Sequence, residues 1–143
     1  MDQWLRSAGN VASGAMPSTS RLSHRDIVLV VDDDPAMLRS VARLLRQFAY
    51  AALLFPSAEA FATHSDFENV VCVLLDINLG DSSGIEVRYR LTTANVSVPV
   101  IYMTGKDNPR IREAALQSGC LAYLTKPFSA QALVEPLKRA SAY

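Results

Sequence analysis

Three aspartates stand side by side at the end of an apolar run in the sequence VLVVDDDPAML, residues 28–38. Adjacent like charges repel, and a carboxylate removed from water is costly unless a cation offsets its charge. Asp32, Asp33 and Asp34 are therefore candidates for holding a cation. An open site rich in carboxylate oxygens suits Mg²⁺ or Mn²⁺.

Three other apolar runs end in side chains that could interact with an oxyanion bound to such a cation. Asp76 ends VLLD, Thr104 follows IYM, and Lys126 lies in YLTKPF. The lysine and the threonine hydroxyl would supply donors for an oxyanion beside the cation. A cation, a lysine, a hydroxyl and one spare carboxylate together describe phosphoryl transfer onto an aspartate.

The three adjacent aspartates need not share one role. Asp34 precedes Pro35, and proline is favoured at the first helical position with aspartate before it as the N-cap. Only one residue can be that cap. We therefore predict that Asp34 caps a helix and that Asp32 and Asp33 serve the metal.

Five short apolar runs alternate with helical patterns from Ile27 onward and must position these side chains. The predicted strands are 27–31, 51–55, 70–75, 98–103 and 121–124. The predicted helices are one after Asp34, then 57–64, 84–94 and 109–118, and a last one capped by Ser129. The first, third and fourth runs are continuously apolar, as in strands buried on both faces of a parallel sheet. The pattern predicts a doubly wound α/β domain with a five-stranded parallel sheet. In such a sheet the ligand site lies beyond the carboxyl ends of the strands.

Composition limits the other classes of function. Fourteen basic and fourteen acidic residues give a formal net charge of zero, so no overall field favours nucleic acid or an anionic membrane. No apolar run approaches the roughly 20 residues of a membrane helix, and the first ten residues lack the apolar core of a secretory signal. The two cysteines lack metal-binding spacing, and we expect Cys72 to be a buried thiol. We predict a cytoplasmic protein.

Residues 1–25 differ in character from the rest of the chain. The stretch SAGNVASGAMPSTSRLSH is small, polar and rich in turn-forming residues, which favours a flexible N-terminal arm. We therefore assign 1–25 to an arm and 26–143 to one folded domain. His24 and His64 receive no role.

The chain resembles the receiver domains of bacterial two-component response regulators, which are CheY-like and flavodoxin-like in fold. The resemblance covers residues 27 to about 140. It rests on VVDDDP, on LLDINLGDSSG with a glycine eight residues after its aspartate, on MTG and on KPF. Each motif alone is weak, but four in this order, each at a predicted strand end, form a specific pattern.

The resemblance implies a role for each acidic residue. Asp76 would be the phosphoacceptor and a Mg²⁺ (or Mn²⁺) ligand. Asp33 would bind the ion directly, and Asp32 would reach it through water. The main-chain carbonyl of Asn78 would complete the protein's share of the coordination.

The resemblance also implies a switch. Lys126 would pair with Asp76 and then with the phosphoryl group, across a Lys–Pro bond that this family often holds cis. Thr104 would bond a phosphoryl oxygen, and the ring of Tyr123 would become buried in response.

A sensor histidine kinase or a phosphotransfer protein would donate the phosphoryl group, and the only chemistry would be phosphorylation and dephosphorylation of the chain itself. The downstream effector is not identified, and a homodimer of the phosphorylated form stays open. No membrane partner and no direct binding of nucleic acid are expected. No output segment follows the last predicted helix, so a stand-alone regulator and a fragment of a longer transcription factor are both open.

Three residues depart from the usual receiver pattern. Gly80 stands where proline is frequent, which should make its loop more mobile and loosen the metal site. Gly105 leaves the phosphoryl pocket open to water and small donors. Pro136 lies inside the last helix, where we expect a kink or an early end that would impair its use as a docking surface.

The main rival is a phosphatase of the haloacid-dehalogenase type, because Asp32 and Asp34 fit a DxD opening. Ala36, however, stands where these enzymes carry threonine or valine, and no second acidic pair occurs late in the chain. A chain of 143 residues also leaves no room for a substrate cap. A nucleotide-binding module is less favoured still, because GxGxxG and GxxxxGK[ST] are both absent.

Overall fold

A computed structural model describes residues 26–142. The predicted N-terminal arm, His24 and the last residue lie outside the described residues.

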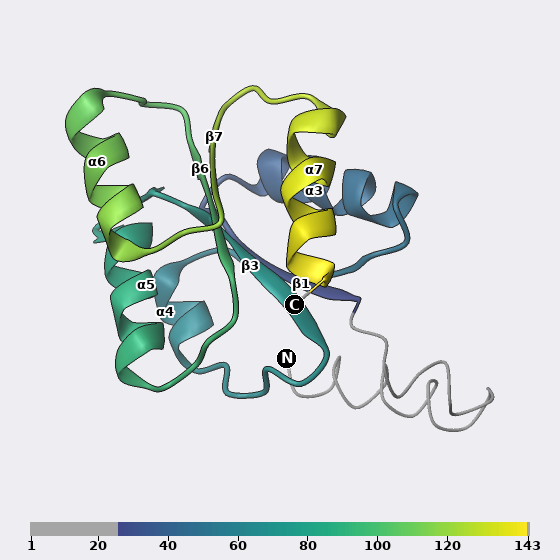
Figure 1. Ribbon diagram of the computed structural model, residues 1–143, viewed down its shortest axis with the longest axis horizontal. Helices are drawn as coiled ribbons and strands as arrows, with labels where there is room; N and C mark the ends of the chain where they lie inside the picture. The colour runs from purple at the N-terminus through teal and green to yellow at the C-terminus, as the bar shows by residue number, and fades with distance from the viewer. Residues whose placement is uncertain (1–25, 143) are drawn as a thin grey trace.

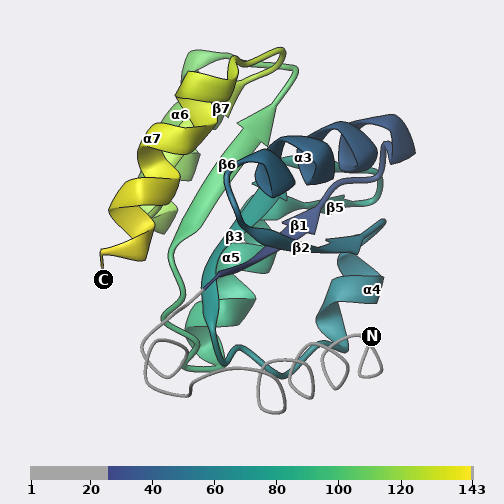
Figure 2. The same cartoon turned by 90° about the vertical axis from the view of Figure 1, so that its right-hand side faces the viewer.

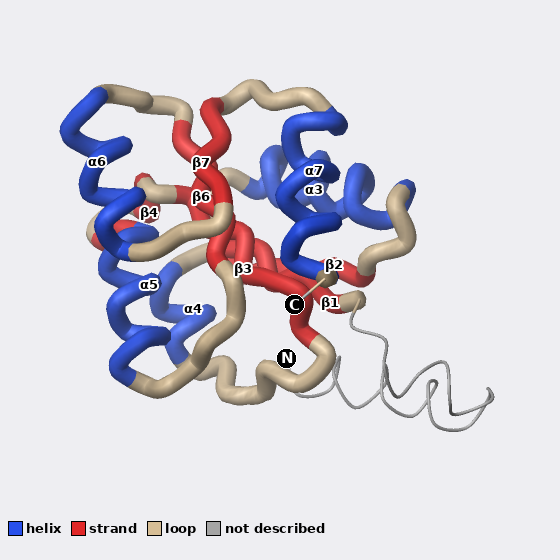
Figure 3. Tube along the Cα trace, viewed as in Figure 1, coloured by secondary structure: helices blue, strands red, loops and turns tan. Residues whose placement is uncertain are grey.

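Five parallel strands form the sheet at the centre of the molecule (Figures 1 and 3). They are β1 (Ile27–Val31), β2 (Ala51–Phe55), β3 (Val70–Asp76), β6 (Val100–Thr104) and β7 (Ala122–Thr125). Their order is β2-β1-β3-β6-β7, with every neighbouring pair parallel. The chain therefore adds strands first on one side of β1 and then on the other, which creates a switch point between β1 and β3.

Within residues 26–142, five helices cover the two faces of this sheet. They are α3 (Pro35–Gln47), α4 (Ala58–Ala62), α5 (Gly84–Thr93), α6 (Pro109–Ser118) and α7 (Ala130–Ser141). Helices α3 and α7 lie on one face, and α4, α5 and α6 lie on the other (Figures 1 and 2). The predicted doubly wound fold is confirmed, with α4 shorter than expected and β6 starting two residues later. Within residues 26–142, no helix has both the length and the apolar character needed to cross a membrane.

Both faces of the central strands are covered, as their continuous apolar runs predicted. All residues of β1 and β3 are buried. Val28 and Val30 pack into the core under α3 and α7, whereas Leu29 and Val31 pack into the opposite core. Side chains of a strand alternate between faces, so β1 is held from both sides. The residues that follow its carboxyl end are therefore attached to a strand that is packed on both faces.

Side-chain caps fix where the helices begin. The Asp34 carboxylate accepts a hydrogen bond from the backbone N–H of Ala36 at 3.0 Å, with Pro35 at the first helical position. The predicted N-cap role of Asp34 is confirmed. Ser83 and Glu86 form a capping box at the start of α5, which the sequence analysis did not identify.

Of the kink or early end expected at Pro136, the early end is wrong, and the kink stays a prediction. Helix α7 continues to Ser141, and Pro136 is itself buried. Leu133 and Leu137 on the same helix are almost fully buried against the sheet. This packing outweighs the one backbone hydrogen bond that proline removes, so α7 continues past Pro136.

Candidate functional site

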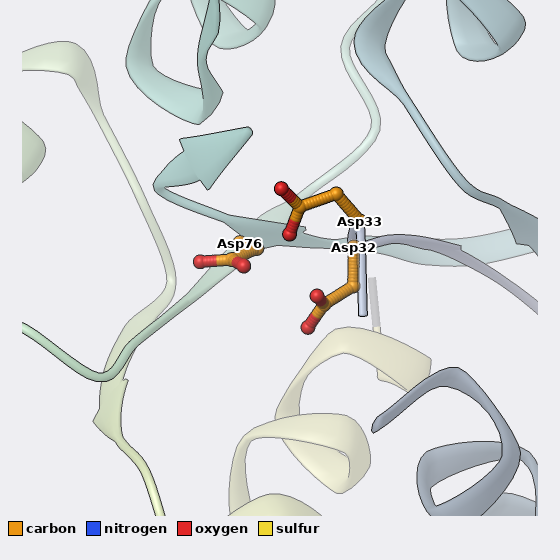
Figure 4. A group of neighbouring side chains, drawn as sticks. All are labelled: Asp32, Asp33 and Asp76. Atoms are coloured by element: carbon orange, nitrogen blue, oxygen red, sulfur yellow. The ribbon is translucent and has the colours of Figure 1, made fainter. Parts of the chain in front are cut away.

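The carboxyl ends of the central strands bring the predicted acidic side chains together at the switch point. Asp32 and Asp33 directly follow β1, and Asp76 is the last residue of β3. One carboxylate oxygen from each lies within 4.8 Å of the others. The three carboxyl groups point toward a common space (Figure 4). Asp34 is not part of this group.

The Lys126 ammonium group bridges two of these carboxylates. Its Nζ donates to Asp32 Oδ2 at 2.8 Å and to Asp76 Oδ2 at 3.2 Å. The backbone fixes this lysine just past β7, where its N–H donates to the carbonyl of Thr104 and its bond to Pro127 is cis. Burial lowers the pKa of Lys126, but the hydrogen bond to Asp32 and the two negative charges outweigh it and raise the pKa above its ordinary value. The lysine therefore stays charged and offsets the acidic pair.

Asp32 and Asp33 are adjacent in sequence but differ in their surroundings. Asp32 is fully buried, and both of its oxygens are used: Oδ1 accepts from the N–H of Asp34 and Oδ2 from Lys126. Asp33 is exposed, and within residues 26–142 its carboxylate makes no hydrogen bond and no ion pair. The oxygens of Asp33 are therefore free to take a ligand, while those of Asp32 are already partnered.

The carboxyl group of Asp76 is buried, and its hydrogen bonds do not fully offset the cost of burying its negative charge. Oδ1 accepts from the N–H of Asn78 at 3.1 Å and Oδ2 accepts from Lys126. Burial, together with the charge of Asp32, raises the pKa of Asp76 to about 6 although Lys126 and the Asn78 N–H oppose the shift. The charged form of this group is therefore held at a cost, which an added cation would reduce.

The loop after Asp76 contains a short ladder that the sequence analysis did not predict. Asn78–Leu79 (β4) and Ser82–Ser83 (β5) pair as a short antiparallel ladder, with Gly80 in the turn at φ 69°. At Gly84, a Cβ atom would lie 2.4 Å from the carbonyl oxygen of Asp76. Only glycine fits that close approach. The ladder was not predicted, and the greater mobility expected from Gly80 stays a prediction.

Thr104 ends β6 with its hydroxyl buried beside the same loop. Its Oγ1 accepts from the N–H of Lys106 at 3.0 Å and from Asn78 Nδ2 at 3.4 Å. Among the described residues the hydroxyl has no acceptor for its own proton. A Cβ at the neighbouring Gly105 would meet nothing within 4 Å, which agrees with the open pocket expected there. The contact from the Asn78 side chain was missed by the sequence analysis.

Tyr123 lies on β7, beside Tyr102 of β6, and its hydroxyl is held outside the acidic group. The hydroxyl donates to Asp107 Oδ1 at 2.9 Å, and the Arg112 guanidinium lies 4.8 Å from the ring centroid. Arg112 also pairs with Asp107 at 2.7 Å. Burial of the ring and the bond to Asp107 raise the pKa of Tyr123 to about 12. Asp107 and Arg112 were missed, because in sequence they look like ordinary surface charges.

Sequence comparison relates this chain to a known protein family. A family described as "Response regulator receiver domain" matches residues 28–138. Nodulation protein W of Bradyrhizobium diazoefficiens is 30% identical over 119 residues, which cover 83% of this chain and 52% of that protein. The transcriptional regulatory protein FixJ of Rhizobium meliloti is 31% identical over 115 residues, covering 80% of this chain and 56% of that protein.

Solved structures show the same architecture. The crystal structure of FixJ-N aligns with a TM-score of 0.76 at 29% identity, covering 82% of this chain and 94% of that one. The BeF3-activated receiver domain of DrrB aligns with a TM-score of 0.71 at 27% identity, covering 82% and 97%.

A five-stranded doubly wound domain with acidic groups at its switch point is the architecture of a two-component signalling domain. The chain belongs to the response regulator receiver family. It spans 52% and 56% of the two curated relatives named above. The haloacid-dehalogenase alternative is not favoured, since Asp34 caps α3 and does not join Asp32 in a DxD pair.

The raised pKa of Asp76 predicts how the metal-free protein responds to pH. A carboxyl group whose pKa rises from 3.8 to about 6 on folding makes the folded state lose stability as pH rises through that interval. Asp76→Asn removes the buried charge. In EDTA at pH 7, we expect this variant to have a free energy of unfolding higher than wild type by on the order of 1–2 kcal/mol, with the difference vanishing near pH 4.

Urea unfolding between pH 4 and pH 7 measures this difference. Asp34→Asn is the matched control, because it removes an exposed aspartate charge and keeps a capping side chain. A metal-free Asp76→Asn variant that is less stable than wild type at pH 7 would contradict the assignment.

Proposed function

We propose that this chain accepts a phosphoryl group on Asp76 from a sensor histidine kinase or a phosphotransfer protein and signals through a change of conformation. The observation that carries the proposal is the buried carboxyl group of Asp76, bonded to Lys126 and grouped with Asp32 and Asp33 at the switch point. A carboxylate oxygen would attack phosphorus as the bond to the donor's imidazole nitrogen breaks, leaving an acyl phosphate. No reaction beyond this self-phosphorylation and its reversal is proposed.

The acidic group fits Mg²⁺ or Mn²⁺, since its donors are all hard oxygens. Asp33 offers unpartnered oxygens and would bind directly, together with Asp76 and the main-chain carbonyl of Asn78. Asp32 already uses both oxygens and would act through water. When bound, the ion would offset negative charge on the transferring group and on the carboxylates.

Lys126 and Thr104 would hold the product. Lys126 already contacts Asp76 Oδ2 at 3.2 Å, so a short movement would bring it to a phosphoryl oxygen on that residue. The Thr104 hydroxyl accepts two hydrogen bonds and keeps its own proton free among the described residues. That proton would form a charge-assisted bond to a phosphoryl oxygen.

The switch would pass from Thr104 to Tyr123 on the next strand. Movement of Thr104 toward the phosphoryl group would empty space behind β6, and the Tyr123 ring would leave Asp107 to fill it. The surface formed by α6, β7 and α7 would change, chiefly over residues 104–124. A bias of a few kcal/mol between two existing states is enough for such a response.

The place of this domain in a larger system follows from its family. We propose a cytoplasmic phosphoprotein that contacts its kinase and an effector by protein–protein interaction, without binding nucleic acid through this domain. A homodimer of the phosphorylated form, a stand-alone regulator and a part of a longer transcription factor stay open.

The first prediction concerns the phosphoryl acceptor. Incubation with acetyl phosphate and Mg²⁺ should add one phosphoryl group to wild type and none to Asp76→Asn, as measured by intact mass. Hydroxylamine should remove it, because acyl phosphates are labile. Asp81→Asn, in the turn of the neighbouring hairpin, is the matched control and should be labelled like wild type. Equal labelling of Asp76→Asn would refute the proposal.

The second prediction separates the three aspartates by Mg²⁺ titration. Asp33→Ala should abolish measurable binding, because it removes a direct ligand, and Asp32→Ala should weaken it. Asp34→Ala should bind Mg²⁺ normally and lose about 0.5–2 kcal/mol of stability through the lost helix cap. A metal defect in Asp34→Ala as large as that in Asp33→Ala would show that the division of roles is wrong.

The third prediction concerns the release of Tyr123. Amide hydrogen exchange with a beryllofluoride mimic of the phosphoryl group should change chiefly within residues 104–124. Asp107→Ala should produce part of that change without the mimic, because it removes the hydroxyl's acceptor. Glu113→Ala, an exposed change on α6, is the control and should not. Changes confined to α3, with residues 104–124 unaltered, would overturn the switch.

A further inference from the structure

A cavity of about 220 Å³ lies between α4 and α5, away from the acidic group. Phe67 and Val96 contribute to its wall. They lie in the segments that lead into β3 and β6, so the cavity lies toward the amino end of the sheet. Asp76 and its neighbours lie at the carboxyl end. The cavity is therefore a separate feature that the proposed phosphoryl transfer does not use.

The wall of this cavity is mostly aromatic and aliphatic. Phe61 and Phe67 meet edge to face, with ring centroids 6.3 Å apart at 83°. The His64 ring lies 5.3 Å from Phe67 at 78° and is anchored by its Nε2, which donates to the carbonyl of Asp66 at 2.6 Å. Leu91 of α5 adds an aliphatic surface. Fixed rings of this kind suit a flat apolar body.

The lining of the cavity also includes positive charge. Among the described residues that line the cavity, Arg90 is the one with a permanent charge, and none is acidic. Within the described part of the chain, its guanidinium forms no ion pair. A planar guanidinium favours bidentate pairing with a carboxylate. The cavity thus combines a mostly apolar wall with one cationic side chain that can pair with an anion.

We propose that this cavity binds a small aromatic monocarboxylate, with the ring between Phe61, Phe67 and Leu91 and the carboxylate on Arg90. The size fits, since an apolar cavity of about 150 Å³ accommodates benzene. A neutral hydrocarbon would leave the guanidinium unused, and a dianion would bring more charge than one arginine offers. Ala62 and Arg90 in the wall are exposed to solvent, so the affinity is modest, with a Kd of about 1 mM.

Benzoate and its neutral isostere benzamide are the probes, titrated into the full ¹⁵N-labelled chain with backbone amide shifts as the readout. Benzoate should give saturable shifts on α4, on α5 and at residues 64–67, with a Kd near 1 mM. Benzamide should bind about threefold more weakly, as expected for loss of one solvent-exposed ion pair. Arg90→Gln should remove this preference. Arg43→Gln, the same charge change on α3 across the sheet, should keep it.

A second variant tests the cavity itself. Ala62 is exposed on α4 and lines the cavity, so Ala62→Leu should fill the space without disturbing the core and abolish the shifts. Absence of saturable shifts up to about 20 mM benzoate, shifts centred elsewhere, or equal binding of both probes would overturn the proposal.

Discussion

The acidic end of the sheet depends on one interaction: the ammonium group of Lys126 bridges two buried carboxylates. It lies within 3.2 Å of oxygens from two buried carboxylates, Asp32 and Asp76. Removing one partner from a buried, charged arrangement leaves an uncompensated charge that costs several kcal/mol. One cation serves two anions here, and burial together with the charge of Asp32 raises the pKa of Asp76. A further positive charge would lower the cost of keeping both carboxylates ionised.

The rest of the fold keeps this small group of charges in place. β1 and β3 are buried on both faces, so Asp32 and Asp76 cannot relax away from one another without breaking the core. Lys126 reaches them from the far edge of the sheet because its own N–H is tied to the carbonyl of Thr104 at 2.8 Å. Apolar packing thus positions charges that would otherwise separate into water. The carboxylate of Asp33, which has no partner among the described residues, adds an exposed acidic group beside these buried ones.

Much of this could be predicted from the sequence, because the relevant signals are local. Strands β1 and β2 begin and end where the apolar runs do, and the Asp34–Pro35 pair specified the start of α3. The approach of Asp76, Lys126 and Asp32 followed from the rule that parallel strands share a carboxyl edge.

The features that were missed depend on contacts between distant or polar residues. The β4–β5 ladder pairs short polar segments that have no apolar period. The Tyr123–Asp107 bond joins residues 16 positions apart, and nothing local marks the acceptor. The early end predicted at Pro136 failed because burial of α7 outweighs a local backbone penalty. The residue-level roles at the metal and at the switch stay predictions.

The close approach of Gly84 to the carbonyl of Asp76 limits how this loop can vary. The N–H of Gly84 also donates to the carbonyl of Ile77 at 2.9 Å, so the start of α5 and the end of β3 behave as one piece. An insertion between the end of β3 and the start of α5 has to keep the pairing of β4 with β5 in register. Length variation is therefore tolerated only at the turn formed by Gly80 and Asp81. The eight-residue separation of Asp76 and Gly84 sets the distance from the end of β3 to the first turn of α5.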